Sequence, residues 1–572
     1  MDWRSWGSQR FLSSSMTRIS AMLSSVLLFV LAASGAPTVQ LGKTAVFGRN
    51  ISTFGQEFFG GIPYAEPPLG DLRFRPPVLT TSLNETTLDA AQFGASCIQG
   101  ASVNLPGNLP SGSPVSEDCL TINILRPAGV DSTSKLPVMF WTTYLYRYGG
   151  GFITGASVLY NGSAIVEQSV IRGTPVIFVN FNYRLGPFGF PQGQEAADQG
   201  ALNLGIKDQI AALEWVQKNI GKFGGDERKV LAFGESAGSI LTSILFLNNR
   251  VDKLARAAIF ESGSQATVAI FPAARRENLW TNFVGSVPSC ASLAGTHSTF
   301  SCLRNATTQE LSSGFNTALA ESAEPFPWDP VIDGPQGLIP DLPSRLLAQG
   351  NFSRIPFIAG TNLDEGTLFT SQSLNSTAAV NASLIPERLP SVSPAVLQSS
   401  VTELLELYPD VPALGSPFGT GNNTFGLSSQ FKRAAAIDGD LDFHSQRRLW
   451  IEAAASAGVK TFGYLFTQPQ PDGLPQLGVS HGSEIVYVFG APVDTSPSSV
   501  AISRIMIDYW VSFATSLTPN DGLGTPRAEW TPFTPTSKSL IQLNGANLTM
   551  IPDTYREEQI SFINSNPVIW RH

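Results

Sequence analysis

Dense clusters of basic residues are missing from this sequence, and their absence argues against nucleic acid as a partner. The 572 residues include 36 Lys and Arg against 45 Asp and Glu, which gives a formal net charge of -9. Positive charge gathers only in short pairs such as Arg275-Arg276 and Arg447-Arg448. An acidic chain without a basic patch is poorly suited to a phosphate backbone. The 14% of charged and 42% of hydrophobic residues indicate a globular chain with a sizeable core.

Long apolar runs are also missing beyond the N-terminus. Three arginines precede an apolar stretch over residues 22–33, and small residues follow at 34–36. This order is typical of a secretory signal peptide, and the stretch is too short for a comfortable membrane span. We therefore expect residues 1–36 to be a signal peptide, residues 37–572 to form one domain, and the protein to be secreted without stable membrane insertion. An uncleaved signal anchor is the alternative, and Met16 is a second candidate for the start.

Cysteine is rare, with four residues in the whole chain. Cys97 and Cys119 are close in sequence, as are Cys290 and Cys302, so two local disulfides are the economical choice among three possible pairings. Metal binding is the alternative, but no histidine lies near the first pair and only His297 lies between the second. Nine glycosylation sequons also fit export. They begin at Asn50, Asn84, Asn161, Asn305, Asn351, Asn375, Asn381, Asn422 and Asn547.

A Gly-x-Ser-x-Gly motif at residues 234–238 indicates a serine nucleophile. It follows an apolar run at 230–233 and precedes small and aliphatic residues, which is the layout of a strand, a tight turn and a helix. Such a turn lifts Ser236 out of the sheet beside backbone N–H groups that can hold an oxyanion. The same motif recurs at residues 478–482, but there it follows a Pro/Gly-rich loop and lacks the strand. A purely structural turn is the alternative at both places.

Histidine is as rare as cysteine, so the general base can be chosen almost by elimination. His572 is terminal, His297 lies inside the predicted disulfide loop, and His444 is expected at the start of a helix. His481 lies in a glycine-flanked loop that would let its ring approach another backbone, although a surface loop is the alternative.

The acid that orients the base should lie between serine and histidine in the chain. Residues 362–366 fit, because they form a turn after a short apolar strand. Asp364 and Glu365 compete for the role, and their spacing cannot decide between them. An oxyanion loop is expected at residues 148–152, where glycines can offer bare N–H groups. A phosphate-binding loop is the rival, but no Lys-Ser/Thr follows it.

Continuous apolar runs alternate with helical periodicity, which predicts an α/β fold with a mostly parallel sheet. Residues 370–435 are rich in Ser, Pro, Asn and Leu and are expected to form a cap over that sheet. The predicted elements are strands at 136–141, 175–181 and 354–360, a strand over the apolar run at 230–233, and a helix at 208–220.

Several longer blocks carry a resemblance to a known family. They are Gly60 to Ala65 with Leu72 to Phe74, Ser116 to Leu120, Gly149 to Phe152, Asn203 to Gln209, Ala212 to Val216 with Phe223 to Asp226, Gly234 to Gly238, Asp364 to Gly366 and Val479 to Gly482. In these blocks the chain resembles the type-B carboxylesterase/lipase family, which includes cholinesterases and fungal lipases. The pattern is closest to secreted fungal carboxylesterases and lipases. The resemblance runs from about Leu41 to the C-terminus and implies an α/β-hydrolase fold, with a central sheet flanked by helices and cap insertions.

The resemblance also implies roles for single residues. It implies a catalytic triad of Ser236, His481 and Glu365 rather than Asp364. The resemblance also implies oxyanion donors, a buried polar network and two disulfides. The donors are Gly150, Gly151 and Ala237, the network is Glu235, Ser264 and Glu484, and the disulfides are Cys97–Cys119 and Cys290–Cys302. Simple structural hydrogen bonding is the alternative for the polar network.

The implied function is a secreted serine hydrolase that cleaves carboxylic esters through an acyl-enzyme. Small-molecule or lipid esters are the expected substrates, and no metal or other cofactor is expected. A triglyceride or sterol-ester lipase of the same fold is one alternative. A non-enzymatic adhesion-type homologue is the other, although the intact triad argues against it.

The sequence departs from the family pattern at two places. Residues 142–147 add about five residues between the strand that ends at Trp141 and the glycine loop. Polar residues fit poorly in a central strand, so this segment is expected to leave the sheet as a loop or bulge. The Cys97 to Cys119 loop is short, turn-rich and without tryptophan, which favours an esterase with a small lid over a cholinesterase and leaves lipase activity open.

Overall fold

The computed structural model describes residues 35–572 apart from 101–108, 143–149, 249–250, 325 and 390. The predicted signal peptide lies outside the described residues except for its last two positions. The predicted insertion also lies outside them, except for Thr142.

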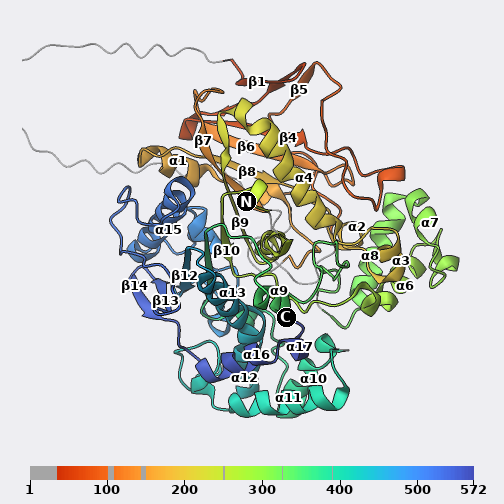
Figure 1. Ribbon diagram of the computed structural model, residues 1–572, viewed down its shortest axis with the longest axis vertical. Coiled ribbons are helices and arrows are strands. Elements are labelled where there is room, and N and C mark those ends of the chain that lie inside the picture. The colour runs from red at the N-terminus through yellow and green to blue at the C-terminus, as the bar shows by residue number, and fades with distance from the viewer. Residues whose placement is uncertain (1–34, 101–108, 143–149, 249–250, 325, 390) are drawn as a thin grey trace, which may run out of the picture. The chain divides into compact units, whose positions relative to one another are not determined.

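A mixed sheet of 11 strands forms the centre of the fold (Figure 1). Its order is β14-β13-β12-β11-β10-β9-β7-β8-β6-β4-β3, and every neighbouring pair from β13 to β8 is parallel. The predicted mostly parallel α/β sheet is therefore confirmed, with antiparallel strands added at both edges. The strands are β3 (Arg49–Ile51), β4 (Gln56–Pro63), β6 (Thr121–Pro127), β7 (Leu136–Thr142), β8 (Ile177–Phe181), β9 (Gly225–Glu235), β10 (Ala257–Glu261), β11 (Phe357–Asn362), β12 (Thr461–Phe466), β13 (Ser539–Leu543) and β14 (Thr549–Pro552). A small second sheet consists of β1 (Thr38–Leu41), β2 (Thr44–Phe47) and β5 (Thr87–Asp89).

Helices cover this sheet, which explains why its central strands are continuously buried and mostly apolar. Every residue of β8, β10, β11 and β12 is buried, as expected for strands packed on both faces. The helices in contact with the sheet include α1 (Ser163–Ile171), α4 (Leu204–Asn219), α5 (Ala237–Ile244), α13 (Ser445–Ser456) and α15 (Pro497–Ser516). Further helices are α2 (Gly186–Gly189), α3 (Gly193–Asp198), α6 (Glu277–Gly285), α7 (Phe300–Asn305), α8 (Thr308–Glu321), α9 (Pro343–Ala348), α14 (Ile485–Val488), α16 (Glu557–Ser565) and α17 (Pro567–Trp570).

The segment expected to form a cap is helical and has a small core of its own. It contains α10 (Thr377–Leu384), α11 (Pro394–Leu407) and α12 (Ser429–Gly439), which lie with α16 and α17 at the lower end of the view in Figure 1. Aliphatic residues of α10, α11 and α12 pack there against Ile563 and Trp570 of the C-terminal helices. The C-terminal segment therefore helps to hold the cap.

Thr142 is the one residue of the predicted insertion that the structure describes, and our expectation for it was wrong. It is the last residue of β7, is fully buried and pairs with Gly234 of β9. Its hydroxyl lies 3.1 Å from the Thr242 hydroxyl and accepts a hydrogen bond of 2.8 Å from Gln209. Thr142 stays in the sheet because helices α4 and α5 supply partners for its polar atom.

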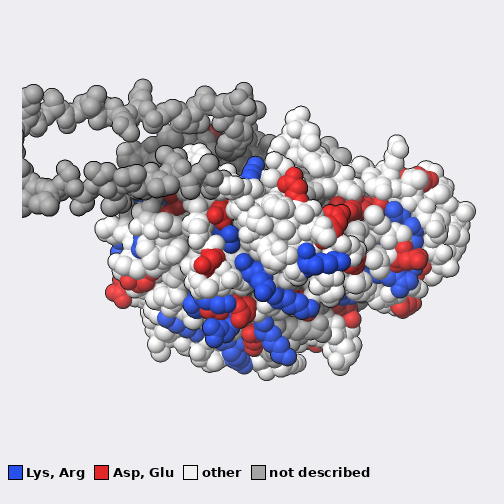
Figure 2. Space-filling model, turned by 90° about the horizontal axis from the view of Figure 1, so that it is seen from above, with Lys and Arg blue, Asp and Glu red and all other residues white. Residues whose placement is uncertain are grey.

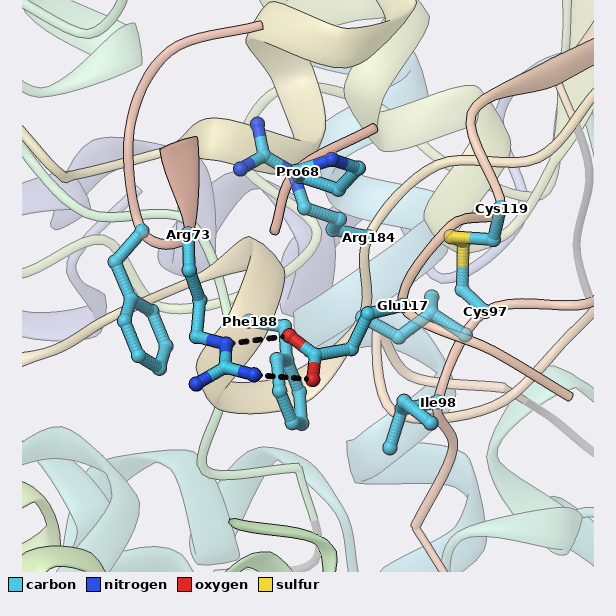
Figure 3. Close-up of a pocket in the computed structure, with 10 residues that line it drawn as sticks. Pro68, Arg73, Cys97, Ile98, Glu117, Cys119, Arg184 and Phe188 are labelled. Atoms are coloured by element: carbon cyan, nitrogen blue, oxygen red, sulfur yellow. Dashed lines mark hydrogen bonds and ion pairs between the residues drawn. A yellow bond between two sulfur atoms is a disulfide. The ribbon is translucent and has the colours of Figure 1, made fainter. Parts of the chain in front are cut away.

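An ion pair and a disulfide fix the base of the Cys97 to Cys119 loop (Figure 3). The Arg73 guanidinium donates to both carboxylate oxygens of Glu117 at 2.7 and 2.8 Å. It also donates to three backbone carbonyls between residues 303 and 306. The structure contains the disulfide at this loop, with an S–S distance of 2.03 Å, and the Cys290–Cys302 disulfide at 1.97 Å. Two of the sequence blocks thus meet in one buried contact.

Charged side chains of both signs are mixed over the described residues on the face shown in Figure 2. Within the described part of the chain, no helix combines the length and the apolarity that a membrane span requires.

We predict that Arg73→Met lowers the free energy of unfolding by about 3 to 5 kcal/mol, because it leaves the buried Glu117 carboxylate without its cation. Urea unfolding measures this loss. The control is Arg345→Met, whose pair with Asp341 has side chains 51% and 39% exposed. The control should change stability by less than about 1 kcal/mol. Equal effects of the two substitutions would contradict the structural role of Arg73.

Candidate active site

Ser236 occupies a strained turn between strand β9 and helix α5. Its backbone has φ 51° and ψ -122°, a combination that residues other than glycine rarely adopt. A Cβ at Gly234 would lie 2.8 Å from the Gly238 carbonyl carbon, and a Cβ at Gly238 would lie 2.3 Å from the Thr142 oxygen. The two glycines are therefore required because strand, turn and helix approach so closely. This arrangement agrees with the predicted turn.

His481 is held between two glutamates in the loop after β12. Its Nδ1 lies 2.6 Å from Glu365 Oε2, and its Nε2 lies 3.2 Å from Glu235 Oε1. The other oxygen of Glu365 accepts a hydrogen bond of 2.6 Å from the Asn362 N–H. One oxygen of the Glu365 carboxylate is thus held by a backbone N–H, and the other oxygen faces the imidazole. Since Glu235 directly precedes Ser236, the imidazole lies beside the turn that carries the serine.

Asp364, the competing acid, faces away from the imidazole. Its carboxylate accepts hydrogen bonds from the Ser416 hydroxyl at 2.9 Å, the Phe418 N–H at 2.8 Å and the Val479 N–H at 2.9 Å. Its N–H also donates to the Val479 carbonyl at 3.0 Å. Asp364 therefore anchors the loop that carries His481, whereas Glu365 contacts the ring.

Four fully buried glutamates interact in this region: Glu235, Glu261, Glu365 and Glu484. Glu235 and Glu261 are paired on the neighbouring strands β9 and β10. Burial raises the pKa of both carboxyl groups well above the usual range, and the nearby carboxylates raise it further. The same causes raise the pKa of Glu484 to about 7. A neutral Glu235 leaves the imidazole without a permanent ion pair at Nε2.

The predicted polar network has a different serine from the one expected. Glu484 accepts a hydrogen bond from the Asn362 side chain at 2.5 Å, and its other oxygen lies 3.4 Å from the Ser262 hydroxyl. Ser264 instead accepts from the Ala266 N–H at 3.4 Å and donates its N–H to Thr267. Ser262, two residues earlier, is the serine that reaches Glu484.

The described part of the predicted oxyanion loop forms a tight turn. The Gly150 carbonyl accepts hydrogen bonds from the N–H groups of Ile153 at 2.8 Å and Thr154 at 3.1 Å. Gly151 has φ 47°, and a Cβ there would clash with the Phe326 ring at 1.8 Å. Ala237 is the first residue of α5, where a backbone N–H has no partner within the helix. Residues 143–149, including Gly149, lie outside the described part of the chain.

Ser236 opens to a cavity of about 470 Å³ that Gly151 and Ala237 also line. Two aromatic residues of this lining, Phe369 and Phe443, pack on the His481 ring with centroid distances of 5.0 and 4.7 Å. His481 itself lines a second cavity of about 110 Å³ together with its neighbours Ser480 and Gly482. The ring thus forms part of the partition between the two cavities.

The three other histidines lie elsewhere. His297 is 3.6 Å from Glu277 and largely exposed. His572 is buried and contacts the Gln446 side chain. His444 lies 3.0 Å from both the Thr361 and Tyr555 hydroxyls. It ends a π-helical turn, Asp440–His444, and is the residue directly before α13, so the expected helix start agrees with α13 although helical turns also precede it.

Sequence reasoning missed Glu261, Phe369 and Phe443 as part of this region. Glu261 has a signal that could have been used, because it ends a buried apolar run and a carboxylate is rare there. Phe443 has no such signal in the sequence, because its side chain reaches the cavity through the π-helical turn.

Comparisons with known proteins give a consistent result over nearly the whole chain. A model described as the carboxylesterase family matches residues 35–563. Lipase 1 of Geotrichum candidum is 34% identical over 587 residues, covering 96% of this chain and all of that protein. Secreted lipase 1 of Botryotinia fuckeliana is 34% identical over 562 residues, covering 93% of each chain. The crystal structure of Aspergillus niger EstA matches with a TM-score of 0.80 at 26% identity, covering 94% of this chain and 99% of that one. These matches confirm the α/β-hydrolase fold.

We predict that Glu484→Gln weakens the pH dependence of stability. In the folded protein the Glu484 carboxyl keeps its proton up to a pKa of about 7, whereas its ordinary value is 4.5. Between these values the unfolded chain binds fewer protons, so the free energy of unfolding falls as pH rises. Removing the group should reduce the fall between pH 5 and 7 by about 2 to 3 kcal/mol.

Urea unfolding at several pH values measures this change. The control is Glu214→Gln, at an exposed position of α4, which should leave the pH dependence as it is. If the free energy of unfolding falls between pH 5 and 7 as much in the Glu484 variant as in the unchanged protein, this carboxyl does not retain a proton on folding.

Proposed function

We propose that this chain, which belongs to the carboxylesterase family and is a carboxylic-ester hydrolase, acts through an acyl-enzyme formed on Ser236. The observation that carries the proposal is the contact chain from Glu365 through His481 to Glu235, whose last member directly precedes Ser236. It supplies an oriented base beside a serine that is held in a strained turn.

The reaction follows from these positions. Ser236 Oγ attacks the ester carbonyl carbon while His481 Nε2 takes the hydroxyl proton. The N–H groups of Gly150, Gly151 and Ala237 hold the negative carbonyl oxygen. When the ester C–O bond breaks, the imidazolium gives its proton to the leaving alcohol, and the acyl group stays on the serine.

Water then completes the turnover. It attacks the acyl carbon while His481 takes one of its protons, and the proton returns to Ser236 Oγ as the carboxylic acid leaves. Glu365 acts throughout through Nδ1, where it fixes the ring orientation and stabilises the imidazolium. Glu235, Glu484 and Ser262 position the strand ends around the ring, whereas the hydrogen bonds of Ser264 within the described part of the chain are local.

Lipase activity is the second candidate, because the relatives with 34% identity are named lipases. An adhesion-type protein without activity fits less well, since the serine, histidine and glutamate are all present.

We also propose that the protein is secreted after removal of residues 1–36. One relative is named a secreted lipase, and the two disulfides suit an oxidising compartment. Eight of the nine sequon asparagines are exposed, and Asn381 is half-buried, so these positions are available for glycans.

We predict that Ser236→Ala lowers kcat for a p-nitrophenyl ester by about 10⁴-fold or more, because the nucleophile is lost. The matched control is Ser480→Ala in the second Gly-x-Ser-x-Gly motif, which should keep kcat within about tenfold. Both are measured by steady-state hydrolysis with thermal unfolding as a check on folding. Near-complete activity in Ser236→Ala would contradict the proposed nucleophile.

A further inference from the structure

The cavity at Ser236 has a charged wall that a hydrocarbon substrate would not require. This wall contains Arg276, Glu324, Asp329, Arg388 and Asp442, and all five line the same cavity as the serine. They come from the loops before α6 and α9 and from the cap around α10 and α12. The sequence pair Arg275-Arg276 thus belongs to the cavity region, with Arg276 in its lining.

The charges of this wall are organised in ion pairs. Arg276 Nη2 lies 2.6 Å from Glu324 Oε2, and the same guanidinium also pairs with Asp329. Arg275 pairs with the other oxygen of Glu324 at 2.5 Å. Arg388 Nη2 lies 2.6 Å from Asp442 Oδ1. Three guanidinium groups therefore balance three carboxylates, and Asp438, a further member of the wall, accepts a hydrogen bond from Thr370.

The carboxylates, rather than the guanidinium groups, are accessible in these pairs. The side chains of Asp442 and Glu324 are 26% and 20% exposed, whereas those of Arg388 and Arg276 are 5% and 9% exposed. The wall thus presents hydrogen-bond acceptors whose charge is already paired. Neutral hydrogen-bond donors suit such a surface, because a carboxylate covered by hydrocarbon would lose its solvation without replacement.

Aromatic residues line the part of the cavity nearest the catalytic histidine. Phe369 and Phe443 pack on the His481 ring, and Phe326 fills the space over Gly151. Phe443 is the residue after Asp442, so one π-helical turn supplies both an apolar and a polar part of the lining. An occupant that matches both parts has an apolar portion and a hydroxylated portion.

We propose that the preferred substrates of this site are neutral esters that carry hydroxyl groups, which donate hydrogen bonds to Asp442 and Glu324. The inference rests on the proposed ester hydrolysis at Ser236 and names its substrate class. An ester with only hydrocarbon chains either does not contact these carboxylates or displaces their water without donating a hydrogen bond in return. Cationic esters gain little at Asp442 and Glu324, because these two carboxylates already have arginine partners.

Two matched sets of esters test this on the full-length protein. The first set has one acyl group and three alcohols: butyl butyrate, glycerol monobutyrate and butyrylcholine. The second varies the acyl part: methyl butyrate and methyl 3-hydroxybutyrate. We expect kcat/KM for the hydroxylated member of at least one set to exceed that of its apolar partner by about tenfold or more.

The variant Asp442→Leu should reduce this ratio about tenfold, because it replaces an accessible acceptor with an apolar side chain. Glu324→Gln serves as a second variant if Asp442→Leu fails to fold. The control Asp252→Leu changes an exposed aspartate away from the cavity lining and should keep the ratio. Hydrolysis without a preference for the hydroxylated ester in either set, including a preference for butyrylcholine in the first, would overturn the inference while leaving ester hydrolysis intact. Failure to hydrolyse any of the five esters would overturn the proposed function and this inference with it.

Discussion

The close backbone contact between the turn at Ser236 and the end of strand β7 is the constraint on which the site depends. Gly238 lies so near the Thr142 carbonyl that no Cβ fits between them. This contact sets where α5 begins, and hence where the N–H of Ala237 and the hydroxyl of Ser236 lie. A left-handed serine costs on the order of 1 to 3 kcal/mol, so the packed sheet and α5 must hold it in place.

The buried glutamates are a second consequence of this arrangement. Parallel strands end together at one edge of the sheet, so β9, β10 and β11 deliver Glu235, Glu261 and, just beyond, Glu365 to one region. Four carboxyl groups cannot all be charged there, and burial resolves the conflict by keeping some of them protonated. The Glu365 carboxylate is set apart by its hydrogen bond from the Asn362 backbone and by its contact with His481. The site thus combines one oriented acid with neighbouring carboxyl groups whose pKa is raised by burial.

Much of this could be predicted from the sequence, for physical reasons that also explain the failures. The turn at Ser236 was predictable because glycine spacing and apolar runs encode it locally. The choice between Asp364 and Glu365 was not, since adjacent side chains in a turn diverge in directions that spacing does not specify; the family resemblance supplied it. Thr142 was misjudged because its hydroxyl partners, on α4 and α5, are distant in the chain.

Covalent labelling of the folded protein distinguishes Ser236 from other serines as the activated nucleophile. The folded protein is treated with an organophosphate ester, digested and mapped by mass spectrometry. We expect one adduct per chain, on the peptide that contains Ser236, because the imidazole held by Glu365 and the proposed oxyanion donors lie beside the turn of this serine. An adduct on Ser480, or no adduct on folded protein, would contradict the assignment of Ser236 as the nucleophile.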